Sequence, residues 1–569
     1  MKRGFSLGMM LLVAVATVAQ TAKLAPELKQ AASSQNVAVI VQYRTMPQAS
    51  QLSGMVLRNG VITGQLNVIN AVRAVVPAGA LASLSADPNV TYISPDRMVR
   101  GHLNNAAPAI LANYAWSLGL DGSAIGVAVI DSGIHQVDDL GLAAGGSRIK
   151  VSFDYTGEGL DDLYGHGTHV AGIIGGNGGD SSCAVCSVSI KGIAPNVNLL
   201  SFRVLNSHGE GTESGVIQAI QAAIQLKSTY NIRVMNLSLG RPVFESYQQD
   251  PLCHAVEQAW KAGIVVVVSA GNGGRDNSAG TGGYATIEAP GNDPYVITVG
   301  AANSKGTPDR GDDVMASYSA KGPTAIDHIV KPDFVAPGNR VVSLAAPGWL
   351  ETQYPQNLVP LSYYEPLGSS DSSPSYFVLS GSSMAAAMVS GAVAMMVQQD
   401  PTLTPDQIKA RLMKTAYKGL ARYVTVTDGD ETYNVQSDAF TVGTGYLDVQ
   451  AALMNRDKAP GVAKSPTAVY DPASGNVYFV ADAQTPWGLS LYWGKMASAP
   501  SPTVWGSATV WGPGAFVPDA PPIGNSAMWG SSAMWGNSAM WGNSAMWGNS
   551  AMWGNSAMWG NELVVKGEQ

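Results

Sequence analysis

The stretch Val127-Ala128-Val129-Ile130-Asp131-Ser132-Gly133-Ile134 is an apolar run that ends in an aspartate and a turn. Such a run is typical of a buried parallel strand, and the carboxyl ends of such strands line the sites of α/β sheets. Similar runs alternate along the chain with segments that favour helix. This alternation predicts an α/β fold, with a doubly wound, mostly parallel sheet and helices on both faces. We expect strands at 126–131, 197–203, 233–238 and 264–269, and helices at 166–175, 213–226 and 252–262.

A serine lies at the start of one predicted helix. The stretch Gly381-Ser382-Ser383-Met384-Ala385 follows a strand-prone segment, 376–380, and precedes small apolar residues that favour helix. A helix N-terminus leaves backbone N–H groups unpaired and carries partial positive charge. Ser383 can therefore attack a carbonyl while its own N–H faces the developing oxyanion. Taken alone, a serine at this place is usually a helix cap, so the interpretation depends on finding its partners.

Two other segments supply candidate partners. Asp131 ends the first strand, and Gly165-His166-Gly167-Thr168-His169-Val170-Ala171-Gly172 places His166 at the start of a small-residue helix. A neutral serine is a poor nucleophile and needs an adjacent base. His166 would take the proton of Ser383, and Asp131 would hold the imidazole in the required tautomer. Singly, such residues are more often turn or surface residues; their joint occurrence favours catalysis.

These three segments resemble the signatures of the subtilisin-like serine peptidases, or subtilases, in the order that the family uses. Segments 234–240, 265–272 and 317–338 resemble the same family, and the likeness covers roughly residues 112–455. The resemblance implies hydrolysis of peptide bonds through an acyl-enzyme, with the side-chain amide of Asn272 and the N–H of Ser383 binding the oxyanion. It also implies substrate-binding residues, namely Ser238, Leu239, Gly240, Ala270, Gly271 and Glu288.

The chain departs from the family pattern at two places. Ser382 stands where the family usually has threonine, and Ala387-Met388 stand where it usually has Pro-His. The missing proline would alter the first turn of the helix, since proline favours that position. The four expected catalytic positions are all intact, so the pattern favours an active enzyme.

The first hundred residues contain two expected segments. Residues 1–22 have a basic start, a short apolar core and small residues for cleavage, which predicts a signal peptide and a secreted, cell-surface or periplasmic location. Residues 36–100 resemble the family's inhibitory prodomain, which would make the protein a zymogen and its own prodomain an intramolecular partner. The alternative is an ordinary α+β domain. The peptidase domain is expected at 108–455.

Two features suggest cleavage next to basic residues. The link after the predicted prodomain contains Arg100-Gly101, and we hypothesise that maturation cuts between them. Glu288 falls where the family often keeps a small residue at the base of its primary specificity pocket. A carboxylate there would pair with an Arg or Lys of the substrate. The alternative is that Glu288 is a solvated loop residue.

Composition and cysteine usage add further expectations. The net charge is −8, without long runs of one sign, so nothing indicates a nucleic-acid partner. Export permits disulfides, and a local Cys183–Cys186 bridge is one option, whereas two thiols alone make a poor zinc site. Cys253 is expected to be a buried helix residue. Segment 344–376 is interpreted as an insertion that shapes the cleft or covers a sheet edge.

Metal requirements follow only from the family resemblance. The serine chemistry needs no cofactor, whereas structural calcium is common in the family. Candidate acidic loops contain Asp161-Asp162 and Asp309 with Asp312-Asp313. The spacing in these loops is not specific, and each loop is more simply interpreted as a solvated acidic loop.

The C-terminal region, 456–569, has a repetitive sequence. A hairpin is expected near 469–481, and the hexad Asn-Ser-Ala-Met-Trp-Gly follows it. Because six is an even number, all tryptophans of extended strands would face one side, so the hexads fit short strands better than helix. The alternative is a low-complexity tail. The repeats keep open a second class of function, a surface binding or assembly protein that uses the tail. The tryptophans in this register are Trp487, Trp493, Trp505, Trp511, Trp529, Trp535, Trp541, Trp547, Trp553 and Trp559.

Overall fold

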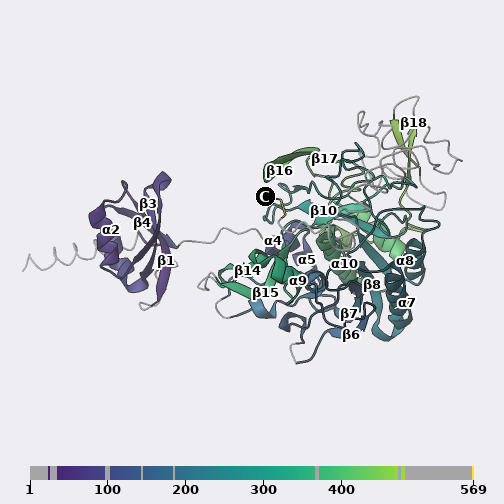
Figure 1. Cartoon of the computed structure of the whole chain (residues 1–569), viewed down its shortest axis with the longest axis horizontal. Helices are drawn as coiled ribbons and strands as arrows, with labels where there is room; N and C mark the ends of the chain where they lie inside the picture. Colours follow the sequence, from purple (N-terminus) through teal and green to yellow (C-terminus); the bar gives the residue numbers. More distant parts are fainter. Residues whose placement is uncertain are drawn as a thin grey trace, which may run out of the picture. The chain divides into compact units, whose positions relative to one another are not determined.

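The computed structural model divides the chain into two compact units, residues 1–100 and 101–569 (Figure 1). The structure describes residues 23–25, 28, 35–95, 103–142, 145–183, 186–365, 371–471, 476–480 and 567–568. Each unit has a hydrophobic core of its own.

The first unit is a small antiparallel sheet with two helices. The strand order is β2-β3-β1-β4, and all the pairings are antiparallel. Alternate residues of β1 are buried, as expected for a sheet with one covered face. The elements are β1 (Asn36–Tyr43), α2 (Ala49–Val56), β2 (Val61–Leu66), β3 (Ala71–Pro77), α3 (Leu81–Ser85) and β4 (Val90–Pro95). This is the α+β arrangement that the sequence indicates for residues 36–100.

The second unit contains an eight-stranded sheet. Its order is β11-β10-β9-β8-β5-β7-β6, with β12 also paired to β10. Every pairing is parallel except that of β10 with β11. The central strands are continuous apolar runs, such as Val-Val-Val-Val-Ser in β9, because both faces of the sheet are covered. The strands are β5 (Gly126–Asp131), β6 (Ile149–Asp154), β7 (Asn198–Arg203), β8 (Ile232–Leu237), β9 (Val265–Ser269), β10 (Ile297–Asn303), β11 (Val314–Met315) and β12 (Phe334–Pro337).

Two pairs of helices cover this sheet. The pair α6 (His166–Gly175) and α10 (Ser382–Gln399) and the pair α7 (Glu213–Tyr230) and α8 (Pro251–Lys261) each pack together. Because α10 and α7 both contact β5 and β8, the two pairs lie on opposite faces. Both helices of the second pair begin at a side-chain N-cap, which is Thr212 for α7 and Asp250 for α8. Further helices among the described residues of this unit are α4 (Leu103–Ala109), α5 (Ala112–Ser117), α11 (Pro405–Thr415) and α12 (Val449–Met454), in addition to a short one described below.

The segment 341–379 forms a separate small sheet. Its order is β13-β15-β14, with strands β13 (Val341–Leu344), β14 (Leu358–Pro360) and β15 (Ser372–Leu379). The short helix α9 (Trp349–Gln353) lies between β13 and β14. Strand β15 leads directly into α10, so this insertion is built onto the segment that carries Ser383.

The expected α/β fold is confirmed, and the elements agree with their predicted ranges to within a few residues. The hairpin expected near 469–481 is present as β18 (Thr467–Asp471) and β19 (Asn476–Val480). A second hairpin, β16 (Tyr423–Asp428) with β17 (Glu431–Gln436), has no counterpart in our sequence predictions. None of the described helices combines the length and the apolar character needed to cross a membrane. The predicted signal peptide, the Arg100–Gly101 cleavage site and the tryptophan hexads lie outside the described residues.

Candidate active site

Asp131 and His166 form a buried pair at the carboxyl edge of the large sheet. Asp131 ends β5 and is fully buried, and His166 is the first residue of α6. Nδ1 of His166 donates to Oδ1 of Asp131 at 2.7 Å. Burial disfavours the imidazolium, but the charge and hydrogen bond of Asp131, together with the charge of Asp162, raise the pKa of His166 above its ordinary value. The pair therefore has the geometry of a histidine base held by a carboxylate.

A second buried carboxylate holds the turn that carries His166. Asp162 accepts hydrogen bonds from Ser132 Oγ at 2.9 Å, from the N–H of Gly165 at 2.7 Å, and from the N–H and Oγ1 of Thr168 at 2.8 and 2.7 Å. Burial raises the pKa of Asp162. From the sequence, Asp162 is expected only as a candidate calcium ligand. The structure shows that both of its oxygens already bind protein donors.

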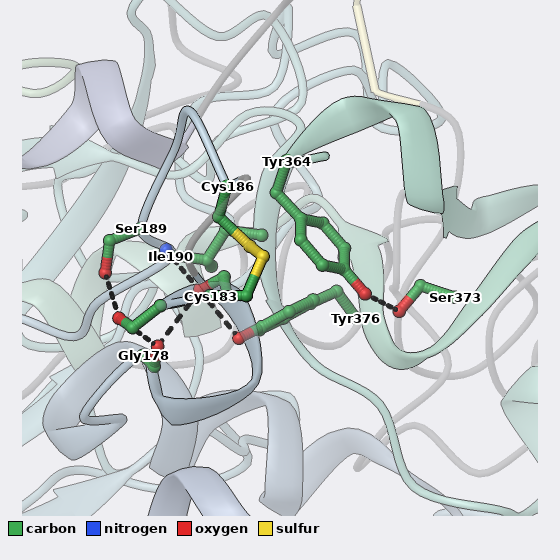
Figure 2. The surroundings of a disulfide bond; sticks show 10 residues. Gly178, Cys183, Cys186, Ser189, Ile190, Tyr364, Ser373 and Tyr376 are labelled. Carbon is green, nitrogen blue, oxygen red and sulfur yellow. Dashed lines mark hydrogen bonds between the residues drawn. A yellow bond between two sulfur atoms is a disulfide. The ribbon is translucent and has the colours of Figure 1, made fainter. Parts of the chain in front are cut away.

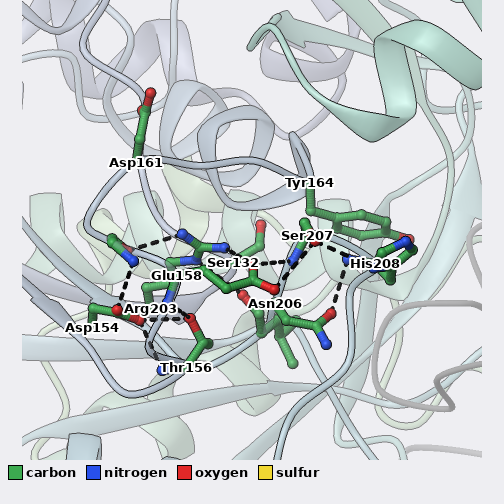
Figure 3. Close-up of polar contacts among 12 residues, drawn as sticks. Ser132, Asp154, Thr156, Glu158, Asp161, Tyr164, Arg203, Asn206, Ser207 and His208 are labelled. Carbon is green, nitrogen blue, oxygen red and sulfur yellow. Dashed lines mark hydrogen bonds and ion pairs between the residues drawn. The ribbon is translucent and has the colours of Figure 1, made fainter.

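A cluster of charged and polar residues fixes the loop between β6 and α6, as Figure 3 shows. Arg203, at the end of β7, donates to Glu158 Oε2 at 2.5 Å and to the carbonyl oxygen of Gly159 at 2.9 Å. Asp154 Oδ2 accepts from the N–H of Gly159 at 2.8 Å. In the sheet, the backbone of Arg203 lies opposite Asp131 of β5 on one side and opposite Asp154 of β6 on the other. The loop that leads to His166 is thus tied to the strand beside Asp131.

The insertion supports the same loop from another direction. The N–H groups of Trp349 and Leu350 donate to the carbonyl oxygens of Leu163 and Tyr164 at 2.9 and 3.1 Å. The rings of Trp349 and Tyr164 stack with their centroids 5.7 Å apart. Of the two roles considered for segment 344–376, these contacts agree with shaping of the region around His166.

Ser383 is the second residue of α10, as expected from the sequence. Its side chain is nearly buried, and its Oγ donates to the carbonyl oxygen of Ser238 at 3.3 Å. Ser238 Oγ donates in turn to the carbonyl oxygen of Ser383 at 2.9 Å. Within the described residues, the structure records no hydrogen bond between Ser383 and His166. Catalytic hydrogen bonds are often long or poorly aligned before substrate binds.

Asn272 lies in the turn after β9 and contacts the residues next to Ser383. Its Oδ1 accepts from the N–H of Ser382 at 2.9 Å and from Ser382 Oγ at 3.2 Å. The amide nitrogen of Asn272 lies near Gly381, since a Cβ added to Gly381 would fall 3.2 Å from it. Gly381 has a φ of +150°, which side chains rarely adopt. The serine at 382 keeps a hydroxyl at the position where the family pattern has threonine.

Glu288 lies between the two segments that are expected to bind substrate. Its N–H donates to the carbonyl oxygen of Ala270 at 3.1 Å. A Cβ added to Gly240 would fall 2.2 Å from Glu288 Oε2, and one added to Gly271 would fall 2.8 Å from its Cδ. The half-buried carboxylate therefore fills space that these two glycines leave open. Three further residues of the predicted substrate-binding set, Ser238, Leu239 and Ala270, are buried.

The structure contains a Cys183–Cys186 disulfide (Figure 2). Its loop packs near the insertion, since the N–H of Ser187 donates to the carbonyl oxygen of Tyr364 at 2.8 Å. Within the described residues, the only group of three metal-ligating side chains is Cys183, Cys186 and Glu365, and the disulfide uses both sulfurs. Cys253 is buried in α8, as expected.

Comparison with known proteins places the chain in a family. Residues 122–445 match the model of the subtilase family. The chain is 36% identical to serine protease AprX of Bacillus subtilis (strain 168) over 376 residues, which cover 64% of this chain and 78% of that protein. It is 30% identical over 399 residues to subtilisin E of the same organism, covering 69% and 84%. A crystal structure of a cold adapted subtilisin-like serine proteinase matches with 27% identity and a TM-score of 0.37, covering 53% of this chain and 86% of that one.

The chain therefore belongs to the subtilase family. It is a subtilisin-like serine peptidase, a hydrolase whose chemistry needs no cofactor and whose substrates are proteins or peptides.

Proposed function

We propose that this protein is a secreted serine endopeptidase, made as a zymogen, in which Asp131, His166 and Ser383 form the catalytic triad and Asn272 binds the oxyanion. The observation that carries the proposal is the buried hydrogen bond of 2.7 Å between His166 Nδ1 and Asp131 Oδ1. This bond leaves Nε2 of His166 as the nitrogen available to a serine. Ser383 supplies that serine at the start of α10.

The chemistry follows from these roles. Ser383 Oγ attacks the carbonyl carbon while its proton moves to Nε2 of His166, and Asp131 stabilises the imidazolium that forms. The oxyanion accepts hydrogen bonds from the Asn272 amide and from the N–H of Ser383. Collapse of the intermediate breaks the C–N bond, and His166 returns the proton to the leaving amine. Water then attacks the acyl-enzyme with His166 again acting as base, which releases the acid and restores Ser383.

The proposal includes a preference for arginine or lysine on the carboxyl-donating side of the cut bond. Its support is the Glu288 carboxylate, which lies against Gly240 and Gly271. A fixed carboxylate in a partly buried pocket pairs favourably with a guanidinium or ammonium group. The same preference would permit self-cleavage after Arg100, before Gly101.

The zymogen and export parts of the proposal rest on the N-terminal sequence. Residues 1–22 have the composition of a signal peptide, and residues 36–100 precede the peptidase domain as an inhibitory prodomain would. One relative, 32% identical over 303 residues, is named minor extracellular protease Vpr of Bacillus subtilis (strain 168). We also propose that any calcium bound by the protein has a structural role and takes no part in the reaction.

The direct test compares the intact mass and the N-terminus of purified wild-type protein with those of Ser383→Ala. We expect the wild type to lose its first hundred residues and to begin at Gly101, whereas Ser383→Ala remains uncut at that bond. A new N-terminus elsewhere would show that maturation does not cut after Arg100. Identical processing of both proteins would show that cleavage does not use Ser383.

A further inference from the structure

Gly567 and Glu568, close to the end of the chain, lie inside the second unit. Glu568 is 1% exposed, although charged residues are almost never fully buried unless they are paired. The segment between them and β19, residues 481–566, lies outside the described residues. The contacts of these two residues therefore show where the chain returns to the catalytic unit.

The Glu568 carboxylate has three donors. Nη2 of Arg275 donates to Oε1 at 2.9 Å, the N–H of Ser317 donates to the same oxygen at 2.7 Å, and Ser317 Oγ also donates to it. Arg275 has other partners, since its Nη1 pairs with Asp428 at 2.8 Å and its guanidinium lies over the ring of Tyr433 at 4.2 Å. Arg275 is thus held in place by groups that do not belong to the C-terminal segment.

A second set of contacts involves the backbone. Asn339 Nδ2 donates to the carbonyl oxygen of Glu568 at 2.8 Å, and the N–H of Glu568 donates to Asn339 Oδ1 at 2.8 Å. Gly567 has a φ of +64°, and an added Cβ would lie 2.4 Å from Ser380 Oγ and 2.6 Å from Arg340 Cγ. Only glycine fits this position without displacing its neighbours.

The residues that make these contacts come from loops around the candidate active site. Arg275 follows the turn that holds Asn272, and Ser380 lies three residues before Ser383. Ser380 Oγ accepts from the N–H of Arg340 at 2.8 Å, and the N–H of Gly381 donates to the carbonyl oxygen of Gly338 at 2.8 Å. We call the set Arg275, Ser317, Asn339, Arg340 and Ser380 the C-terminal site.

We propose that the C-terminal site is a binding site for a glycine–glutamate segment, and that its ligand is the chain's own Gly567–Glu568. The site combines three features. Arg275 pairs with the carboxylate, and the Asn339 side chain both donates to and accepts from the backbone of Glu568. The space next to Gly567 leaves no room for a side chain at that position. Burial alone would lower the pKa of Arg275, but its hydrogen bonds to Asp428 and Glu568 raise it, as expected for a built ion pair. The described residues on either side of 481–566, namely β19 and Gly567–Glu568, consequently both belong to the second unit, and Glu568 contacts the loops that adjoin the candidate active site.

Hydrogen exchange of the full chain, in the Ser383→Ala background to prevent self-cleavage, tests this inference. Two amides report on the site, because the N–H of Glu568 and that of Ser317 are both buried donors. We expect both to be protected, and we expect Glu568→Lys to make both exchange at least about tenfold faster, because it places a second cation beside Arg275. Full exchange of the Glu568 amide at the earliest time in the parent protein would overturn the proposal.

Two further variants separate binding from a general disturbance of the chain end. Gly567→Ala keeps the charge and is expected to expose the same two amides, whereas the matched change Glu562→Lys, six residues earlier, is expected to leave both protected. Adding an acetylated peptide of residues 562–569 to the Glu568→Lys protein should restore protection of the Ser317 amide, and the same peptide with alanine at 567 should not. Equal protection in all variants, or no rescue by the peptide, would contradict the assignment. These readouts do not depend on peptidase activity.

Discussion

Two fully buried aspartates, Asp131 and Asp333, have opposite surroundings in the same unit. Asp333 Oδ2 accepts from Lys331 Nζ at 2.9 Å and from the N–H of Thr298 at 2.8 Å. Its Oδ1 accepts from Ser465 Oγ at 2.5 Å and lies 3.3 Å from Lys409 Nζ. Asp131 Oδ1 accepts from His166 and from the N–H of Ser132, but its Oδ2 has no hydrogen-bond partner among the described residues.

The difference separates a carboxylate that pairs with two buried lysines from one that, in the function we propose, serves proton transfer. Burial would raise the pKa of Asp333, but Lys331 and Lys409 lower it overall, so the carboxylate is permanently charged at neutral pH. Burial also lowers the pKa of Lys409 to about 7, although the charge of Asp333 acts to raise it. Asp131 instead faces a histidine, whose charge changes near neutral pH.

The largest expected effect comes from Asp131→Asn. The amide cannot hold His166 in the tautomer that accepts a proton from Ser383, so we expect kcat to fall about 10⁴-fold, the magnitude known for triad aspartates, that of subtilisin included. At a pH above the raised pKa of His166, where the imidazole is neutral, the thermal unfolding midpoint should change little. Steady-state kinetics on a peptide substrate and thermal melting measure the two quantities. A near-normal kcat in this variant would show that Asp131 is not a member of the triad.

The next effect is on stability and comes from Asp333→Asn. Removing the charge leaves the buried Lys331 and Lys409 side chains without their counter-charge, and breaking such a buried pair typically costs about 3–5 kcal/mol. Urea denaturation in the Ser383→Ala background measures the free energy of unfolding without self-digestion. The matched control is Asp457→Asn, because Asp457 pairs with Lys414 on the surface, where such pairs contribute little. If both variants unfold alike, the assignment of Asp333 as the structural carboxylate fails.

A smaller effect is expected from Glu288→Gln. Losing a charge-assisted hydrogen bond of roughly 1.5–3 kcal/mol lowers kcat/KM for substrates with arginine or lysine at the cut by about 10–100-fold. Substrates with leucine at the same position should be affected little. Matched fluorogenic peptides that differ only in this residue provide the measurement. Unchanged selectivity would mean that Glu288 does not contact the substrate.

The smallest effect is a difference in pH dependence between the two aspartate sites. Because the pKa of His166 is raised, kcat/KM should rise with pH along a limb that lies above 6.5, since the base must be neutral. The stability that the His166–Asp131 pair contributes runs the other way: it is fully present below 6.5 and is lost as the pH rises through the raised pKa. The contribution of Asp333 is present above 3.8 and is lost as the pH falls through its lowered pKa.

This difference is measured by following kcat/KM and the free energy of unfolding as functions of pH, in the wild type and in the variants. The stability loss on the alkaline side should disappear in a His166→Ala protein, and the loss on the acid side should shrink in Asp333→Asn. An activity limb below 6.5 would contradict the role given to Asp131, because its charge and hydrogen bond are the main influences that raise the pKa of His166 against the effect of burial.

The sequence was sufficient to predict the central strands of the large sheet, the helices that cover it, and the places of Asp131, His166 and Ser383 at the ends of these elements, because apolar runs and small-residue helices are local patterns. Asp162, Arg203 and Asp333 could not be recognised in the same way. Each acts through partners that are distant in sequence, and an isolated acid or arginine is usually a surface residue. The contact of Glu568 with Arg275 spans nearly 300 residues, and no periodic pattern marks it.

The most direct test of the account is active-site labelling with a fluorophosphonate, followed by peptide mapping of the labelled residue. Such a probe forms a bond to an activated serine, so only a serine next to a working base reacts quickly. The account predicts one label per chain, on Ser383, with much slower labelling in Asp131→Asn and none on Ser383 in His166→Ala. A label on another serine, or equal labelling rates in the three proteins, would contradict the assignment of the triad.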